Sequence, residues 1–424
     1  MLVLPPSIAP LVTSYQPVNA YPMGMSFFPL DSVYFTDEVL GVVTVSSMYI
    51  GNSYLPNGQF FATGNASLQL NAMVDGLYWA QDVALFHQVD NRTFDVTLVV
   101  NVWDLAGPFR FNVSEGNVST YNGLGVICYV GPTYEVTAPF SLSLFMVDNS
   151  SALYFGFKLG NHTGVYYTVP IRGQFQIGGI SALGVPNDLE LVFGGPGGGS
   201  VVQMYVEGTE ELYFDNGGVL QVVPQAFSVG LDTAESVVGV RSVGNVSDIY
   251  SPFAQLNRGS DDLAVLWPVK PQLNVEYDNS TVTVELTYEG KPISGQEVEL
   301  EEFSFPSVLR VADVGVTNSS GSVTFRYNSS DFVVYYPGNF SLSSTYYISA
   351  PYITSAAKSL TSAYDSLLSF ITHYNFKKGI ASFFGDRSSI EYKSEVPADY
   401  LLLMYVSAFA VGVVISALLL KFKH

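Results

Sequence analysis

The 424-residue sequence contains little cysteine and few basic residues. Cys128 is the only cysteine, so no disulfide can form within the chain. Lys and Arg number 17 against 37 Asp and Glu, which gives a formal net charge of −20, and no basic patch precedes residue 377. Because nucleic-acid binding depends on clustered positive charge, we expect no nucleic-acid partner. The few charges would leave only a mild positive charge in acid, which such a chain would tolerate.

Several familiar site patterns are absent as well. His87 and His162 stand alone, without the spacing of metal ligands, so we expect no metal site and no cofactor. Neither a Ser-His-Asp nor a Cys-His set can be assembled, and the Asp-Ser/Thr-Gly motif of pepsin-like proteases does not occur. The glycine-rich run 194–199 lacks the Lys-Ser/Thr of a phosphate-binding loop, so it indicates a flexible rim of a cleft or a tight turn.

One long apolar run lies near the C-terminus. Residues 400–420 carry no charge, and the basic sequence Lys-Phe-Lys-His follows at 421–424. At roughly 1.5 Å per residue, a helix over this run would span about 31 Å, which matches the hydrocarbon core of a bilayer. We therefore predict a single-pass protein of the cell membrane, with a transmembrane helix at 400–420, a cytoplasmic tail at 421–424 and the large preceding part outside. A buried helix of a soluble domain is the alternative.

Residues 1–19 do not resemble a complete signal peptide, since they lack a basic start and prolines interrupt their apolar run. Either an upstream signal has been lost, or the chain is anchored by its tail and faces the cytosol. Eleven Asn-X-Ser/Thr sequons favour the outside, because such sequons are acceptors for glycans on surface loops of exported proteins. The predicted glycosylation sites are Asn65, Asn91, Asn112, Asn117, Asn149, Asn161, Asn245, Asn279, Asn318, Asn328 and Asn339.

The rest of the chain divides into a large β domain and a smaller one. Residues 20–255 are rich in aromatic residues, Val, Thr and Ser, are punctuated by Gly and Pro, and show no helical period, which predicts a β-sandwich. Residues 268–350 contain the regularly alternating strand 281–288, followed by turn residues and further short strands. Their pattern resembles the small immunoglobulin-like modules of surface proteins. The expected fold class is thus an all-β ectodomain of two sandwiches.

The apolar period changes after residue 350. Apolar residues in 353–376 recur at alternating spacings of four and three, as in the seam of a coiled coil, and residues 377–399 then form a linker. We predict a short coiled-coil helix that joins copies of the chain into a homo-oligomer; the alternative is one amphipathic helix packed on the smaller module. The predicted seam consists of Ile353, Ala357, Leu360, Tyr364, Leu367, Ile371 and Tyr374.

Four ordered motifs stand out in the large domain. They are Y-W-A-Q-D-V at 78–83, N-V-W-D-L-A-G at 101–107, D-L-E-L-V-F-G-G-P-G-G-G at 188–199 and D-T-A-E at 232–235. Together they resemble the motifs of thermopsin, the acid endopeptidase family of acidophilic archaea, over roughly residues 20–245. The resemblance implies a thermopsin-like β-sandwich and an activity against peptide bonds at low pH.

Acid proteolysis requires two groups that share a proton, one to activate water and one to polarise the scissile carbonyl. Glu190 is the strongest candidate, because a carboxylate within the apolar run 189–193 is costly unless it is paired or protonated. Alternation along a strand sends Gln81 and Asp82 to opposite faces, so only one of them can point into a given cleft. Structural roles, such as a capping turn at 232–235, are the alternative. The candidate catalytic residues are Glu190, Asp82, Asp232 and Glu235, with Gln81 as an amide partner and Glu38 further from the motifs.

Two functions fit these expectations. The order of head, small module, heptad helix and membrane span resembles the small membrane-anchoring subunit of the two-component surface layers (S-layers) of thermoacidophilic archaea. That resemblance implies a glycosylated stalk whose partner is an extracellular surface-layer protein, and we take it as the first hypothesis, because a spacer and a coil are superfluous for digesting soluble peptides. The alternative is a membrane-tethered, thermopsin-type acid endopeptidase that cleaves protein substrates at low pH and high temperature, which the intact motif set favours.

Overall fold

A computed structural model describes residues 20–349 of the chain, apart from residues 30, 112, 150, 182, 261, 279 and 305–307. The N-terminal segment 1–19, the predicted coiled coil, linker, membrane span and tail, and the sequons at Asn112 and Asn279 therefore lie outside the described residues. The described part of the chain is built of strands and contains no helix that could cross a bilayer. The prediction of an all-β fold is thereby confirmed for these residues.

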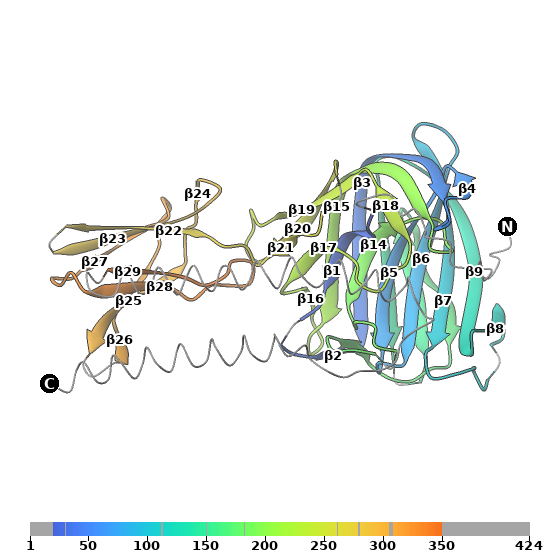
Figure 1. The fold of residues 1–424 in the computed structure, drawn as a ribbon, viewed down its shortest axis with the longest axis horizontal. Helices are drawn as coiled ribbons and strands as arrows, with labels where there is room; N and C mark the ends of the chain where they lie inside the picture. Colours follow the sequence, from blue (N-terminus) through green and yellow to red (C-terminus); the bar gives the residue numbers. More distant parts are fainter. Residues whose placement is uncertain are drawn as a thin grey trace. The chain divides into compact units, whose positions relative to one another are not determined.

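The large head is formed by two mixed-length β-sheets that we call the first and the second sheet (Figure 1). The first has 11 strands, in the order β21 (Val265–Trp267), β17 (Ala226–Val229), β1 (Met23–Phe27), β14 (Leu189–Gly194), β5 (Asn65–Val74), β6 (Tyr78–Gln88), β7 (Thr93–Asp104), β9 (Leu124–Thr137) and β8 (Asn117–Tyr121). Strand β13 (Phe175–Ile177) pairs with β5, and β2 (Tyr34–Thr36) pairs with β13.

The second sheet has 10 strands. Their order is β12 (His162–Val169), β11 (Leu153–Leu159), β10 (Phe140–Asp148), β3 (Glu38–Tyr54), β15 (Val201–Asp215), β20 (Phe253–Arg258) and β19 (Val240–Asn245), with β16 (Leu220–Val222) and β18 (Ser236–Val238) beside β15 and β4 (Phe60–Thr63) beside β3. Most pairs are antiparallel, but β18 runs parallel to β15.

Alternating side chains fill the space between the two sheets. In β7 the even-numbered residues from Phe94 to Val102 are buried, while most odd-numbered residues are partly exposed. This is the period of two that a strand imposes when one of its faces packs on a core. The sheets approach closely at Gly41 of β3, where an added Cβ would lie 2.7 Å from Cδ1 of Leu191 in β14. Gly41 thus allows Leu191 to fill the core.

The remaining strands form two smaller antiparallel sheets, each of four strands (Figure 1). One contains β22 (Gln272–Asp278), β23 (Thr281–Tyr288), β24 (Lys291–Pro292) and β27 (Ser322–Arg326); the other has the order β26 (Val308–Val316), β25 (Glu297–Ser304), β28 (Phe332–Tyr336) and β29 (Thr345–Ser349). Strand β23 coincides with the alternating segment recognised in the sequence, and its apolar residues Val282, Val284 and Leu286 are fully buried.

Candidate active site

A row of polar residues crosses the first sheet. Ser26 of β1 lies opposite Glu190 of β14, Glu190 opposite Asn71 of β5, Asn71 opposite Gln81 of β6, and Gln81 opposite Asn101 of β7. Residues directly opposite each other in antiparallel strands share a face of the sheet. Because their neighbours along the strands, such as Leu191, face the second sheet, this row lies on the outer face of the first sheet.

The segment from Gly230 to Glu235, which follows β17, covers part of this face. Its backbone is held by a hydrogen bond from the Gly230 amide to the Pro22 carbonyl (3.0 Å) and by one from the Leu231 amide to Oδ2 of Asp188 (3.0 Å). The Thr233 hydroxyl donates a hydrogen bond to Oε1 of Glu190. Gly230 lies so close to Glu190 that an added Cβ would overlap its carboxyl group. We call residues 230–235 the covering segment.

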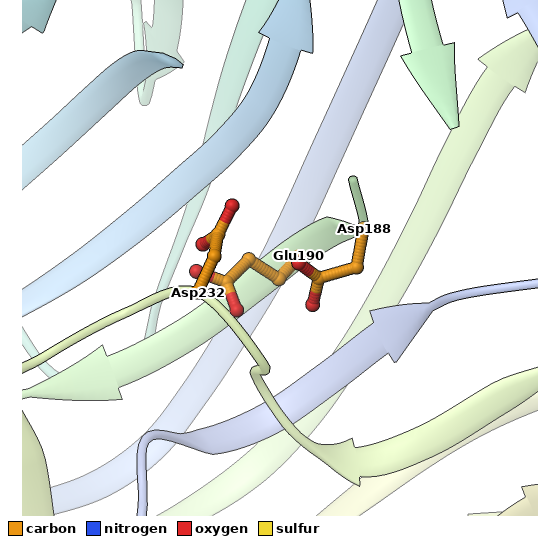
Figure 2. A group of neighbouring side chains, drawn as sticks. All are labelled: Asp188, Glu190 and Asp232. Carbon is orange, nitrogen blue, oxygen red and sulfur yellow. The ribbon is translucent and has the colours of Figure 1, made fainter. Parts of the chain in front are cut away.

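Three carboxyl groups meet under the covering segment (Figure 2). Asp188 directly precedes β14, Glu190 lies two residues further on the same face, and Asp232 comes from the covering segment. One oxygen of each group lies within 4.8 Å of an oxygen of the other two. Asp188 and Glu190 are 0% exposed and Asp232 is 5% exposed, and the buried polar residues of the described chain include no Lys, Arg or His. The acidic cluster is therefore enclosed without a buried basic side chain among the described residues.

Burial and mutual repulsion keep protons on this cluster. Burial raises the pKa of Asp232 well above its usual value, and the nearby Glu190 and Asp188 raise it further. The pKa of Asp188 is likewise raised, first by burial and then by Glu190, although the Leu231 amide opposes part of the shift. Oδ1 of Asp188, Oε2 of Glu190 and both oxygens of Asp232 have no hydrogen-bond partner among the described residues. The carboxyl groups thus interact mainly with one another and, at Asp232, with the side chain of Trp79.

Amide side chains connect the cluster to the edge of the site. Asn71 donates through Nδ2 to Oε1 of Glu190 (2.7 Å) and to the Thr233 hydroxyl (2.6 Å). Gln69, two residues earlier in β5, accepts a hydrogen bond from Nε2 of Gln81 (3.0 Å) and donates one to Oε2 of Glu235 (3.5 Å). Glu190 thus accepts side-chain hydrogen bonds from both Asn71 and Thr233 within the cluster.

Glu235 lies at the more open end of this network. It is partly exposed, and its Oε1 accepts a hydrogen bond from the amide of Gly199 (3.0 Å). The glycine-rich run 194–199 therefore binds the covering segment, which accounts for its position beside the site. An added Cβ at Gly194 would lie 2.7 Å from Cβ of Glu235, so this close approach requires glycine.

The structure brings some of the predicted candidates together and separates others. Glu190 and Asp232 are direct neighbours, and Gln81 and Glu235 are both joined to the site through Gln69. Asp82 lies on the opposite face of β6, between the sheets, where the hydroxyl of Tyr166 donates to its Oδ1 (2.6 Å). Whether any of these residues is catalytic stays a prediction.

Glu38 belongs to β3 of the second sheet, and its pKa is raised by partial burial and by Asp215. Glu38 therefore interacts with Asp215 and not with the carboxyl cluster of the first sheet.

Asp188 was not among the candidates, although a local signal for it exists. Residues two apart in a strand share a face, so Asp188 accompanies Glu190 wherever Glu190 points. Asn71 and Gln69 had no such signal, because their place beside Glu190 depends on the register between β5 and β14. The three carboxyl groups could also hold a cation where they are ionised. In acid, protons shared among the three carboxyl groups would take the place of such a cation.

The cluster is covered in the described structure, since Asp188 and Glu190 are 0% exposed and Asp232 is 5% exposed. A cavity of about 620 Å³ lies elsewhere in the head, lined by residues of β9–β12 such as Tyr134, Ser143, Lys158 and His162. The ring of His162 packs against Tyr134 with 4.5 Å between ring centroids, and His87 contacts Oδ1 of Asn65 (3.2 Å), so neither histidine joins the carboxyl cluster. A substrate could reach the cluster only if the covering segment moved.

Comparison with known proteins gives one match. The family model described as Thermopsin matches residues 8–240, more than half of the chain, and this range contains all four sequence motifs and the three clustered carboxyl groups. No curated protein and no solved structure matches the chain. The chain belongs to the thermopsin family.

Proposed function

We propose that the head is an acid endopeptidase whose catalytic pair is Glu190 and Asp232. The observation that carries this proposal is the enclosed cluster itself, in which carboxyl groups from two distant segments meet without a buried basic side chain, in a chain of the thermopsin family. Two carboxyl groups at this distance cannot both ionise readily, so one proton is shared between them over a wide range of acid pH. This is the state that peptide hydrolysis by a carboxyl pair requires.

The surroundings distinguish the two partners. Glu190 accepts hydrogen bonds from Asn71 and Thr233, which orient its carboxyl group, so we assign it the role of the general base that takes a proton from water. Asp232 has a raised pKa, because burial and its acidic neighbours outweigh the opposing effect of the Trp79 side chain, so it serves as the acid that protonates the carbonyl oxygen of the scissile bond. The resulting diol collapses when Glu190 passes the proton it took from water to the amide nitrogen, one diol hydroxyl returns its proton to Asp232, and the C–N bond breaks. Asp188 is a positioning residue that anchors Leu231 of the covering segment.

Substrate binding on this proposal requires the covering segment to lift from the outer face of the first sheet. Its far end is held by the two hydrogen bonds of Glu235, to Gly199 and to Gln69, and one of these is long at 3.5 Å. Partial exposure of Glu235 places this end at the surface. An extended peptide would then lie across the row of Asn71, Gln81 and Asn101.

The test is cleavage of an unfolded protein substrate by the purified full-length chain at about pH 2 to 3 and high temperature. We expect Glu190→Gln and Asp232→Asn each to lower kcat by roughly 100-fold or more, since general acid–base groups contribute about that much. Asp95→Asn serves as the matched control, because Asp95 lies partly exposed on the same face in β7. Cleavage by either site variant at the rate of the parent chain would show that the pair is not catalytic.

As a second function we propose that the chain is also the membrane-anchoring stalk of a surface layer. Two features support it: the two small sheets of residues 272–349 lie outside the residues that the thermopsin family model matches, and none of the nine described sequon asparagines is buried. A stalk that carries a peptidase head would combine both functions.

Cell fractionation and glycopeptide mass spectrometry test this second function. We expect the chain in the membrane fraction, crosslinked to a surface-layer protein and to copies of itself, and we expect glycans on exposed asparagines such as Asn91 and Asn161. Asn339 should be the least occupied, because its Nδ2 donates to Oε1 of Gln296 (2.6 Å) and the residue is only partly exposed. A chain found only in the soluble fraction, without glycans, would exclude the stalk.

A further inference from the structure

Two carboxyl groups outside the candidate active site lie in the core between the two sheets. Asp82 projects from β6 of the first sheet and Glu210 from β15 of the second, and both are 0% exposed. Each points towards the opposite sheet: Asp82 accepts a hydrogen bond from Tyr166 of β12, and an added Cβ on Gly24 of β1 would lie 2.7 Å from Oε2 of Glu210. Neither group belongs to the cluster around Glu190.

Glu210 has an apolar environment. The residues opposite it in the adjacent strands are Val43 of β3 and Ala254 of β20, both fully buried, and the first sheet faces it with Gly24. Neither carboxyl oxygen has a hydrogen-bond partner among the described residues. Burial alone raises the pKa of Glu210 well above its usual value, and no charged group of β1, β3, β14 or β20 adds to the shift. The site accepts the neutral acid far better than the anion.

One carboxyl oxygen of Asp82 accepts a hydrogen bond, and the other has no partner among the described residues. The Tyr166 hydroxyl donates to Oδ1, while Oδ2 has no hydrogen-bond partner among the described residues. Burial raises the pKa of Asp82 well above its usual value, and Tyr166 and the amides of Phe145 in β10 and Gly156 in β11 reverse only part of the rise. The titratable groups on this side are the phenols of Tyr166 and, beyond it, Tyr129, which are neutral at acid and neutral pH.

The sign of the pH effect follows from linkage. In the unfolded chain these groups titrate near pH 4, whereas in the folded head their pKa values are raised, so the folded state holds more protons between the two values. The stability contributed by burying them is complete below about pH 4 and is lost as the pH rises towards the folded pKa values. Above that range the core must either contain two anions or open.

We propose that Asp82 and Glu210 form a proton-dependent lock, which keeps the two sheets of the head packed in acid and lets them separate reversibly as the surroundings approach neutrality. The lock confines the folded head to an acidic medium, whatever the head does there. It also means that a copy of the chain in a neutral compartment would lack a packed head. The proposal is independent of the catalytic pair, because neither lock residue touches the cluster under the covering segment.

The experiment measures thermal and urea unfolding of the purified full-length protein between pH 3 and pH 7, followed by near-UV circular dichroism of its aromatic residues. A mild detergent keeps the apolar segment 400–420 in solution. The slope of stability against pH gives the number of protons taken up on folding. We expect the midpoint temperature of the parent chain to fall by roughly 10 °C or more over this range, and its near-UV signal to return when acid is restored.

Glu210→Gln keeps the size of the side chain and removes its titration. On folding near pH 6 this variant should therefore take up about one proton fewer than the parent chain, and its midpoint temperature should fall less between pH 3 and pH 7. Asp82→Asn should act in the same direction. Glu207→Gln is the matched control, since Glu207 lies exposed on the same strand and contacts only Ser47 (2.9 Å) among the described hydrogen bonds.

Three results would overturn the lock. They are a parent chain with the same midpoint at pH 3 and pH 7, a Glu210→Gln variant with the proton uptake of the parent, or a Glu207→Gln control that flattens the pH dependence as strongly. If Glu210→Gln fails to fold, the proton uptake of Asp82→Asn compared with that of the parent chain still decides, and an unchanged uptake would overturn the lock. Cleavage activity is not used in any of these measurements, so the result does not depend on the proposed peptidase.

Discussion

The head and the smaller module bury polar groups of different kinds. In the head, Asp82, Asp188, Glu190 and Glu210 are 0% exposed, whereas the buried polar residues of strands β22–β29 and their loops are neutral, such as Gln296 and Thr317. The backbone amide of Gln296 donates to Oγ1 of Thr317, and the backbone amide of Thr317 donates to the carbonyl of Gln296. Both regions belong to the same acidic chain, so composition alone does not place carboxyl groups in a core. Among the described residues, the buried acids lie in the thermopsin-family region.

The largest expected effect is a difference in how the two regions respond to pH. The pKa values of Asp82, Asp188, Glu210 and Asp232 are all raised by burial, so the head should lose stability as the pH rises above about 4. Hydrogen-exchange mass spectrometry at pH 3 and pH 7, corrected for intrinsic exchange, should show protection in residues 23–267 falling by roughly 100-fold or more, since each unit of pKa shift is tenfold. Peptides from 272–349 should change much less. Equal loss in both regions would remove the distinction.

The next effect separates activity from stability at one residue. Asp232→Asn removes the proposed acid and should lower kcat by roughly 100-fold. At pH 6 to 7 the same change should raise the midpoint temperature. The folded state favours a protonated Asp232 carboxyl beside Glu190 and Asp188, which costs stability at this pH, whereas the Asn amide does not titrate. At pH 3 the two proteins should unfold at similar temperatures. A variant that is both inactive and destabilised at pH 7 would contradict this expectation.

A smaller effect concerns the fit of the covering segment. Gly230→Ala would place a methyl group on the Glu190 carboxyl, so either the covering segment or Glu190 must shift. We expect a loss of about 1 to 3 kcal/mol in the free energy of unfolding, the usual cost of overpacking, together with a changed pH–rate profile. Gly259→Ala is a suitable control, because its nearest neighbours are side-chain atoms of the exposed Arg241. Equal effects of the two changes would show that Gly230 is not specially constrained.

The smallest effect belongs to the module. Arg310 and Glu302 form an ion pair of 3.2 Å with side chains 72% and 34% exposed. Solvent screens such a pair, so Glu302→Gln should change the free energy of unfolding by less than about 1 kcal/mol and leave its pH dependence nearly intact. Urea unfolding at two pH values measures both. A large loss would mean that the module, like the head, depends on its charged groups.

Part of this fold and site was predictable from local sequence. The alternating residues 281–288 form β23, and the opposite faces of Gln81 and Asp82 follow from the period of a strand. The same period would have found Asp188 once Glu190 was suspected. Asp82 and Glu190 are both candidates from the family motifs, yet they lie on opposite faces of the first sheet.

The sequence by itself determined the β architecture of the described residues, the family and the acidic balance of the chain, because alternation, turn residues and ordered motifs are written locally. The meeting of Asp232 with Glu190 was decided only by tertiary structure. It depends on the register of β5, β14 and β1 and on the path of the covering segment after β17, which long-range pairing sets. The same holds for burial: an Asp or Glu in a strand carries no mark of whether water, a cation or an apolar core will surround it, and that environment sets its pKa.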